Sequence, residues 1–246
     1  QEHGTTGVAA GLASTGKIPV FAAIAAFVTN RNYEAFRNDI AYMGQNVKIV
    51  GRNGGITYSD LGPTHYSLED YAIIRMLPGV VVLSPQDPGE IREAAKAMIE
   101  HDGPVYMRIG GPSIPDLFPQ APFTIGEGRM IREGSRATVV TTGTITPEVV
   151  VAVQRLADDG IDVDLIGMPT VEPVDAALIR ASAHRTGRVI TVEEHYTRGG
   201  LSAAVGEALA TSGIPVHAIG LPHEHIVTGT YPGLLARYAL DAAGLD

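Results

Sequence analysis

The alternation of helical and strand patterns from one end of the chain to the other constrains its fold more than any other feature. Short apolar runs rich in valine and isoleucine alternate with longer amphipathic segments that glycine, proline and aspartate bound. This order is typical of an α/β protein with a mostly parallel sheet, because crossover helices connect neighbouring parallel strands. Strands are predicted at residues 19–25, 47–50, 80–83, 104–109, 137–141, 163–166, 189–192 and 216–219.

The segments between these strands predict helices and one break. Asp87 followed by Pro88 is a typical helix start, and residues 67–70 resemble a capping box. Prolines and glycines interrupt residues 110–134, which predicts an irregular linker between two domains. Helices are predicted at residues 4–15, 30–42, 67–76, 87–100, 147–157, 176–183, 200–211 and 232–243. We therefore expect two consecutive α/β domains, at residues 1–112 and 136–246, with a linker at 113–135.

Composition excludes several classes of protein. A formal net charge of −9 argues against nucleic acid or an anionic membrane as a partner, because both require clustered Lys and Arg. The chain has no cysteine, which excludes disulfides, thiolate catalysis and cysteine-ligated zinc. The longest apolar run, residues 18–28, is shorter than the roughly 20 residues that cross a bilayer. We expect a cytoplasmic protein by default. Because the chain begins at Gln1 without methionine, we also expect the first domain to lack its native N-terminal part.

The opening of the chain carries the most specific chemical pattern. Glu2 precedes a run of small residues at 7–13, and the apolar segment that follows contains Phe27. Downstream, Gly62 to His65 form the turn sequence Gly-Pro-Thr-His. A carboxylate, a thin helix that packs closely and an aromatic ring together suggest a pocket for a flat heteroaromatic ligand.

These residues resemble the pyrimidine-binding half of the transketolase family, thiamine diphosphate enzymes that transfer two-carbon ketol units. The matching features are Glu2 with the small-residue run, Phe27, and the Gly-Pro-Thr-His turn. Further segments follow in the family's order: residues 71–78, 80–85, 102–108, 191–195 and 199–201. The resemblance extends to the end of the chain and implies a pyrimidine-binding domain followed by a transketolase C-terminal domain.

The resemblance implies a role for each residue of the opening pattern. Glu2 would hydrogen-bond the aminopyrimidine of thiamine diphosphate and promote loss of the thiazolium proton, a task that suits a shielded carboxyl with a raised pKa. Phe27 would stack on the pyrimidine, and His65 would assist proton transfer to substrate oxygens. Ile24 and Asn30 occupy positions where transketolases usually have further aromatic residues that bind the cofactor. Without the resemblance, Glu2 would be interpreted as solvated and His65 as structural.

Four positions bear on the substrate. Leu61 stands where transketolases usually have an aspartate that contacts a ketose hydroxyl, with Asp60 one position earlier. Asn53 falls where a phosphate-binding histidine is common. Arg108 matches a phosphate-binding arginine, the alternative being a solvated surface arginine. We therefore expect a ketose or ketose phosphate donor and an aldehyde acceptor with a charged tail, and these departures leave open whether the substrate is a standard sugar phosphate.

Two histidine-containing runs in the second half have weaker implications. Residues 193–195, Glu-Glu-His, end a predicted strand, and we interpret them as structural or as part of an interface. Residues 223–225, His-Glu-His, do not supply a full ligand set, so we predict no metal site in this chain.

The printed sequence lacks the Gly-Asp-Gly motif through which the family binds the diphosphate and its metal ion. The resemblance therefore implies a split transketolase, in which an N-terminal transketolase subunit holds the diphosphate together with Mg²⁺ or Ca²⁺. We expect a heterotetramer of two such chains and two partner chains.

Two other functions remain open at this stage. The chain could be the beta subunit of a 2-oxoacid dehydrogenase or of an acyloin-forming thiamine enzyme, which share domain order and cofactor. It could also be a non-catalytic partner subunit, although such a subunit would have no chemical need for Glu2.

Overall fold

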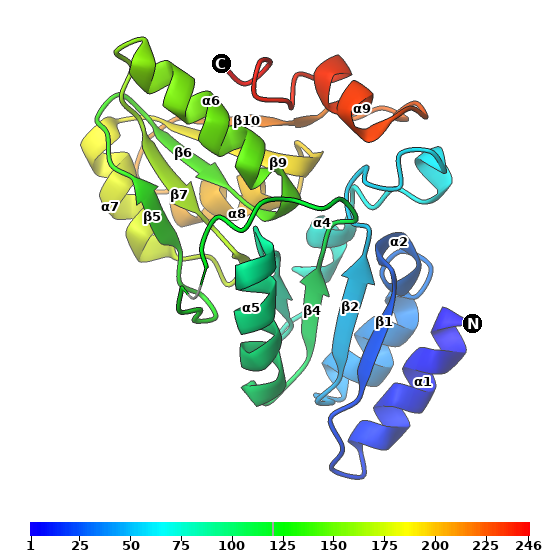
Figure 1. The fold of residues 1–246 in the computed structure, drawn as a ribbon. Helices are drawn as coiled ribbons and strands as arrows, with labels where there is room; N and C mark the ends of the chain where they lie inside the picture. The colour runs from blue at the N-terminus through cyan, green and yellow to red at the C-terminus, as the bar shows by residue number, and fades with distance from the viewer. Residues whose placement is uncertain (120) are drawn as a thin grey trace.

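A computed structural model describes residues 1–119 and 121–246, which form two five-stranded sheets next to each other (Figure 1). In the first sheet the strand order is β1-β2-β4-β3-β8, and all pairs are parallel except β3 with β8. Its strands are β1 (Val20–Ile24), β2 (Lys48–Arg52), β3 (Val81–Leu83), β4 (Val105–Arg108) and β8 (Thr170–Glu172).

Helices cover both faces of the first sheet, because its strands alternate between two apolar cores. On β4, Tyr106 points into one core, whereas Val105 and Met107 point into the other. The first core is covered by α1 (Glu2–Ala13), α2 (Ala25–Val28), the π-helix Phe36–Tyr42 that continues α3 (Tyr33–Ala35), and α4 (Asp70–Ile74). The second is covered by α5 (Pro88–Glu100), which begins with the predicted cap: Asp87 accepts a hydrogen bond from the Glu90 N–H.

The second sheet has the strand order β10-β9-β6-β7-β5, parallel except for β5. Its strands are β5 (Arg129–Arg132), β6 (Thr138–Thr141), β7 (Asp164–Gly167), β9 (Val189–Tyr196) and β10 (Val216–Leu221). The helices α6 (Thr146–Asp158) and α9 (Tyr231–Arg237) pack on one face, and α7 (Ala176–Thr186) and α8 (Leu201–Ala208) on the other. No helix among the described residues is both long and apolar enough to cross a membrane.

The predicted class, two consecutive α/β domains with mostly parallel sheets, is confirmed, but two strands fall outside the predicted ones. The segment predicted to be irregular contains β5, which pairs antiparallel with β7 at the edge of the second sheet. The short strand β8, which the sequence pattern did not reveal, follows β7 in the chain yet extends the first sheet. Both are edge strands held by main-chain hydrogen bonds, so they need no continuous apolar pattern.

Three helix predictions also need correction. The capping box is wrong: α4 begins at Asp70 without a side-chain cap, because Ser67 instead pairs through its backbone with Gly55. The helix predicted from residue 30 begins at Tyr33 and winds into a π-helix. In the last helix, the regular hydrogen bonding ends at Arg237, well before residue 243.

The segment between β2 and α4 leaves the first sheet and packs into the second domain. Ile56, Tyr66 and Leu68 belong to the same apolar core as strands β6, β7 and β9. Gly55 adopts a left-handed conformation with φ of 65°, and the Glu194 carboxyl lies where a β-carbon would be, so only glycine fits there. The two domains therefore share part of one core.

Charged groups cross the junction as well. Arg108 at the end of β4 pairs with Asp70 at 3.0 Å and donates to the Glu194 carbonyl at 2.6 Å. The Glu194 carboxylate accepts from the Ile56 N–H at 2.6 Å and from the Tyr231 hydroxyl at 2.8 Å. These charged side chains are buried, with Arg108 only 6% exposed.

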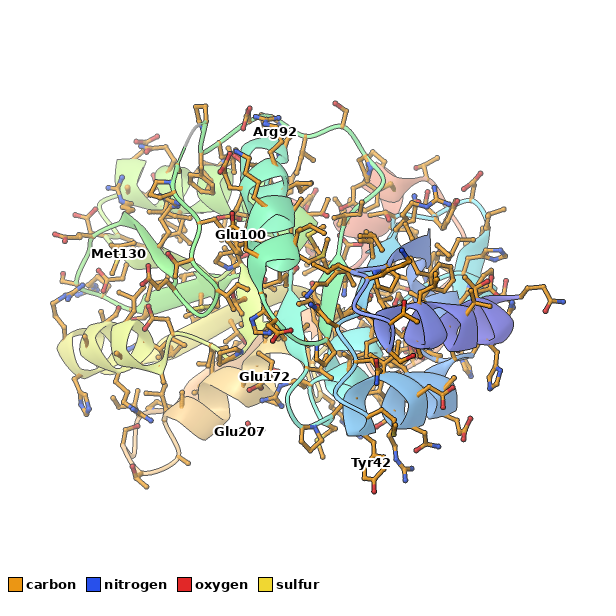
Figure 2. The ribbon with its side chains drawn as sticks, turned by 90° about the horizontal axis from the view of Figure 1, so that it is seen from below. Tyr42, Arg92, Glu100, Met130, Glu172 and Glu207 are labelled. Carbon is orange, nitrogen blue, oxygen red and sulfur yellow. The ribbon has the colours of Figure 1, made fainter. Side chains whose placement is uncertain are left out.

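A second ionic contact also links the two domains. Arg75, which follows α4, lies 2.7 Å from a carboxylate oxygen of Glu207 and 3.5 Å from one of Glu172. Figure 2 shows Glu172 and Glu207 close together where the two domains meet, whereas Tyr42 projects from the lower edge of the first domain in this view. One arginine thus connects the first domain to β8 and α8.

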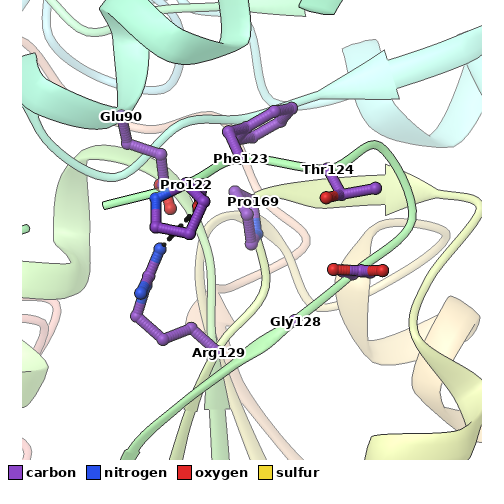
Figure 3. A pocket seen from close by; sticks show the side chains of 8 residues that line it. Glu90, Pro122, Phe123, Thr124, Gly128, Arg129 and Pro169 are labelled. Carbon is purple, nitrogen blue, oxygen red and sulfur yellow. Dashed lines mark hydrogen bonds between the residues drawn. The ribbon is translucent and has the colours of Figure 1, made fainter. Parts of the chain in front are cut away.

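A cavity of about 150 Å³ lies at the same junction, under α5 (Figure 3). Glu90 lines it and is almost completely buried; its Oε2 accepts a hydrogen bond from the Gln86 N–H, and its Oε1 has no partner within the described residues. Burial raises the pKa of Glu90 from 4.5 to about 7, although the Gln86 hydrogen bond opposes this rise. The cavity has room for a few water molecules. Its other lining residues are Pro122, Phe123, Thr124, Glu127, Gly128, Arg129 and Pro169.

Glu90→Gln tests the environment of this carboxyl. Because the pKa of Glu90 is raised in the folded state, its contribution to stability is present below pH 4.5 and is lost as the pH rises through about 7. Glutamine keeps the acceptor for Gln86 but does not ionise. At about pH 8 we expect the free energy of unfolding of the variant to exceed that of the parent by about 2 kcal/mol. At about pH 4 the two values should be nearly equal.

Urea unfolding of both proteins at the two pH values measures this difference. Glu93→Gln, at a half-exposed position of the same helix, is the matched control, and its stability relative to the parent should differ little between the two pH values. An equal effect of Glu90→Gln at both pH values would contradict the raised pKa.

Candidate active site

The structure brings three of the predicted site residues, Glu2, Phe27 and His65, together at the carboxyl end of the first sheet. With Arg31 and Tyr58 they form one continuous strip. Phe27, just after β1, lies 5.2 Å from His65 between ring centroids, with the rings tilted by 54°. His65 in turn contacts Tyr58 edge-on at 5.8 Å. Glu2, at the start of α1, joins the strip through Arg31, whose guanidinium lies 3.0 Å from the carboxylate and 4.1 Å from the centre of the Phe27 ring. Carboxyl ends of parallel strands are where α/β proteins place their sites.

Local hydrogen bonds hold the first half of the strip in place. The chain passes directly from β1 into α2, and the Thr29 hydroxyl donates to the Ala25 carbonyl at 2.7 Å to complete the turn. The buried amide of Asn32 donates to Thr6 in α1 at 2.5 Å. This link fixes the start of α1 beside the segment after α2, which is why Glu2 and Phe27 are neighbours.

The turn that carries His65 is held by its own backbone. Gly62 has φ of 73° and donates to the Tyr58 carbonyl at 3.2 Å, and the His65 N–H donates to the Gly62 carbonyl at 2.9 Å. Pro63 is the second residue of this short 3₁₀ turn, Gly62–Thr64, where its missing N–H leaves no helical hydrogen bond unmade. The Thr64 hydroxyl lies 2.9 Å from Nδ1 of His65, which orients the imidazole.

The electrostatics of Glu2 differ from the prediction. We expected a raised pKa, but the pKa of Glu2 is lowered: the hydrogen bond from its own backbone N–H is the largest cause, and the Gln1 ammonium and the Arg31 guanidinium add to it, while burial opposes it. The side chain is 17% exposed, so the carboxyl is partly shielded from water. The sequence pattern revealed neither these hydrogen bonds nor the Arg31 cation beside the carboxyl.

Five other predicted residues lie at the end of β1 or on the segments that follow β1 and β2. Ile24 is the half-buried last residue of β1, and Asn30 is exposed and accepts a hydrogen bond from the Thr29 hydroxyl at 3.1 Å. Asn53 adopts a left-handed conformation after β2 and packs against Gly111. Asp60 and Leu61 are exposed on the loop that leads to His65, with Leu61 at 47%.

Arg108 does not lie on this strip. Its guanidinium is buried at the domain junction, where it pairs with Asp70, donates to Glu194 and stacks 4.4 Å from the centre of the Tyr71 ring. A substrate phosphate would have to replace these partners inside the protein. The predicted phosphate contact is therefore not supported, and neither is the alternative of a solvated surface arginine.

The histidine-containing runs of the second domain are structural. Glu193 accepts hydrogen bonds from the first N–H groups of α8, Leu201 and Ser202, at 2.7 and 2.8 Å. His195 stacks on Tyr71 at 5.2 Å, so this run packs between the two domains of the chain. His223 contacts Tyr196 edge-on. Within residues 1–119 and 121–246, no group of three acidic, histidine or cysteine residues is arranged to hold a metal ion.

Two residues of the strip were missed by sequence reasoning. Arg31 follows Phe27 by four positions, a spacing that places side chains together on a helical turn and that could have revealed the contact. Tyr58 gave no such signal, because its place depends on the loop between β2 and α4.

The strip fits a flat nitrogen heterocycle. In the structure, a planar group with N–H donors, the Arg31 guanidinium, lies against the Phe27 ring and bonds to the Glu2 carboxylate. An aminopyrimidine has the same requirements, a ring face to stack on and a carboxylate to pair with. The arrangement can therefore bind a planar base and exchange a proton with it, with an imidazole one ring away.

Comparison with known proteins identifies the two domains. The family described as transketolase, pyrimidine binding domain, matches residues 1–114, and transketolase, C-terminal domain, matches residues 126–245. Fold and site thus define a two-domain subunit of a transferase.

Individual relatives agree with this assignment. One of the subunits of the apulose-4-phosphate transketolase of Phocaeicola vulgatus is 37% identical over 246 residues, which cover 99% of this chain and 79% of that protein. A solved split gene transketolase, an inactive beta4 tetramer, superposes with a TM-score of 0.90 at 36% identity and covers 100% of this chain and 79% of its own. A 1-deoxy-D-xylulose-5-phosphate synthase of Syntrophotalea carbinolica is 38% identical over 252 residues, 100% of this chain but 39% of that enzyme. The chain belongs to the transketolase family, whose members depend on thiamine diphosphate.

Arg31→Met tests the electrostatics of the strip. Methionine retains most of the apolar stem but removes the cation, so we expect the pKa of Glu2 to rise. An NMR titration of the Glu2 side-chain carboxyl carbon measures it. Arg37→Met, an exposed arginine for which the described residues show no ion pair, is the control and should leave the titration unchanged. A Glu2 pKa that is the same in all three proteins would contradict the role of Arg31.

Proposed function

We propose that this chain is the subunit of a split transketolase that carries the pyrimidine-binding and C-terminal domains. With its partner it transfers a two-carbon ketol unit from a ketose or ketose phosphate donor to an aldehyde acceptor. The observation that carries this proposal is the convergence of Glu2, Phe27 and His65 on one strip, in a chain whose relatives include transketolase subunits over its whole length.

Each residue of the strip has a task in this proposal. Phe27 supplies the face on which the pyrimidine ring stacks, and Glu2 bonds to a ring nitrogen and shares its proton. His65 moves a proton to or from the substrate oxygen. Ile24 and Asn30 border the ring, and Asn53, Asp60 and Leu61 border the substrate. Thiamine diphosphate, when bound, supplies the chemistry that breaks and forms the carbon–carbon bond.

The contact between Arg31 and Glu2 explains how a carboxyl whose pKa is lowered in the free chain can share a proton once the pyrimidine ring is bound. A pyrimidine ring stacked on Phe27 needs the space that the Arg31 guanidinium occupies, so Arg31 leaves as the ring enters. Loss of the cation and further burial both raise the pKa of Glu2 into the range in which a carboxyl shares a proton. The displaced Arg31 side chain then lies at the edge of the site, where it can contact an anionic substrate group. Arg108 cannot make this contact because it is buried.

A partner subunit completes the site. We propose that an N-terminal transketolase subunit holds the diphosphate and Mg²⁺ or Ca²⁺, and that two chains of each kind form a heterotetramer. The inactive beta4 tetramer of the relative supports a requirement for that partner. The domain limits of 1–112 and 136–246 and a cytoplasmic location also remain proposals.

Glu2→Gln tests the catalytic assignment. Glutamine retains the size of the side chain and its ability to pair with a ring nitrogen, but it holds no exchangeable acidic proton. We expect the pair reconstituted with the partner to lose at least about 100-fold in turnover while still assembling, as measured by coupled assay and by size-exclusion chromatography. His3→Gln, an exposed neighbour on α1, should retain turnover. Unchanged turnover in Glu2→Gln would support the non-catalytic subunit instead.

Substrate choice separates the two enzymatic functions. The second candidate is the beta subunit of a 2-oxoacid dehydrogenase or of an acyloin-forming thiamine enzyme, and the match to a 1-deoxy-D-xylulose-5-phosphate synthase, a related thiamine enzyme, keeps such an alternative as the less supported one. We expect the reconstituted pair to consume a ketose phosphate with an aldose acceptor and to release no carbon dioxide from pyruvate. Carbon dioxide release without ketol transfer would reverse the assignment.

A further inference from the structure

The loop that carries His65 is built largely on the C-terminal domain. Residues 55–67 form a loop whose base is closed by two backbone hydrogen bonds between Gly55 and Ser67, at 3.1 and 3.0 Å. Ile56 and Tyr66, near the two ends of this loop, lie in the core of the C-terminal domain rather than in that of the first domain.

Adjacent side chains on this loop point in opposite directions. His65 faces the strip beside Phe27, while Tyr66, 5% exposed, points into the C-terminal domain. The Tyr66 hydroxyl lies 3.0 Å from the Ser59 carbonyl and 3.0 Å from the Val227 carbonyl. One hydroxyl thus connects both arms of the His65 loop to the segment before α9.

The same segment makes two further contacts with the loop. The Gly229 N–H donates to the Ser59 carbonyl at 3.2 Å. Thr228 occupies the space beside Gly62 that a β-carbon would fill, so the segment reaches the turn directly before His65. Three successive residues of the C-terminal domain, 227–229, therefore touch the loop at Ser59, Gly62 and Tyr66, on both sides of His65 in the chain.

We propose that Tyr66 is a positioning residue through which the C-terminal domain sets the place of the His65 imidazole for catalysis. The proposal rests on the proposed function and extends it. The C-terminal domain then orients a catalytic group that the first domain carries. An imidazole on a loop without this attachment would sample several orientations, and a displacement of about 1 Å at a reacting centre can cost as much as about 100-fold in rate.

The test is a double-mutant cycle in the reconstituted pair. Tyr66→Phe keeps the buried ring and removes only the hydroxyl, and we expect it to lower kcat about 10-fold with a smaller change in KM. In the His65→Ala background the same change should cost less than about 2-fold, because the group that Tyr66 positions is absent. Equal losses in both backgrounds would overturn the proposal.

The control is Tyr196→Phe, which removes a comparable hydroxyl contact, to the Glu224 carbonyl at 3.1 Å, within the C-terminal domain. It should leave kcat and the cycle unchanged.

A readout without turnover keeps the proposal distinct from the proposed function. In the chain alone, the imidazole proton signals of His65, assigned by comparison with His65→Ala, should shift or broaden in Tyr66→Phe, while the other histidine signals stay in place. The control Tyr196→Phe should leave the His65 signals unchanged. A pair without any ketol transfer would refute the proposed function but leave this measurement valid. An unaltered His65 signal in Tyr66→Phe would refute the positioning role.

Discussion

The hydrogen bond from Arg108, which is buried and paired with Asp70 in the first domain, to the Glu194 carbonyl of the second domain is the interaction on which the arrangement of the two domains depends. Both charges are removed from water, and each is satisfied by further hydrogen bonds: Asp70 accepts from the Tyr106 hydroxyl at 2.7 Å, and Arg108 donates to the Glu194 carbonyl. Loss of one partner would leave a buried charge unpaired, which typically costs about 3–5 kcal/mol. The second domain therefore cannot move away from the first without exposing this set of charges.

This rigidity matters because the candidate site is assembled from both sides of the junction. Phe27 follows β1, and the His65 loop begins after β2. The two segments are close because the carboxyl ends of these parallel strands lie at one edge of the sheet. The rest of that loop is held by the C-terminal domain, through Glu194 at its base and residues 227–229 at its tip. A site built in this way has its geometry set by a shared core rather than by either sheet alone.

Charge at the strip explains why the chain has a shielded carboxyl whose pKa is nevertheless lowered. Arg31 pairs with Glu2 and covers Phe27, so in the free chain the acid is ionised and the ring is occupied. A planar base that takes the place of the guanidinium removes the cation and shields the acid further, and both effects favour the protonated form. The proton-sharing state of Glu2 in our proposal is therefore a property of the complete site.

The sequence by itself determined the elements and the order in which they occur. Apolar periodicity placed the central strands and most helices, and the Asp87-Pro88 start was visible because capping depends on neighbouring residues. The resemblance of these motifs to the transketolase family also singled out Glu2, Phe27 and His65 as a group. Tertiary structure alone decided that Arg108 is buried, that Arg31 lies between Glu2 and Phe27, that β5 and β8 extend the sheets, and that Tyr66 belongs to the core of the other domain. These features depend on contacts between residues far apart in the chain, whose free energy is set by burial and pairing after the two domains meet, and no local pattern contains that information.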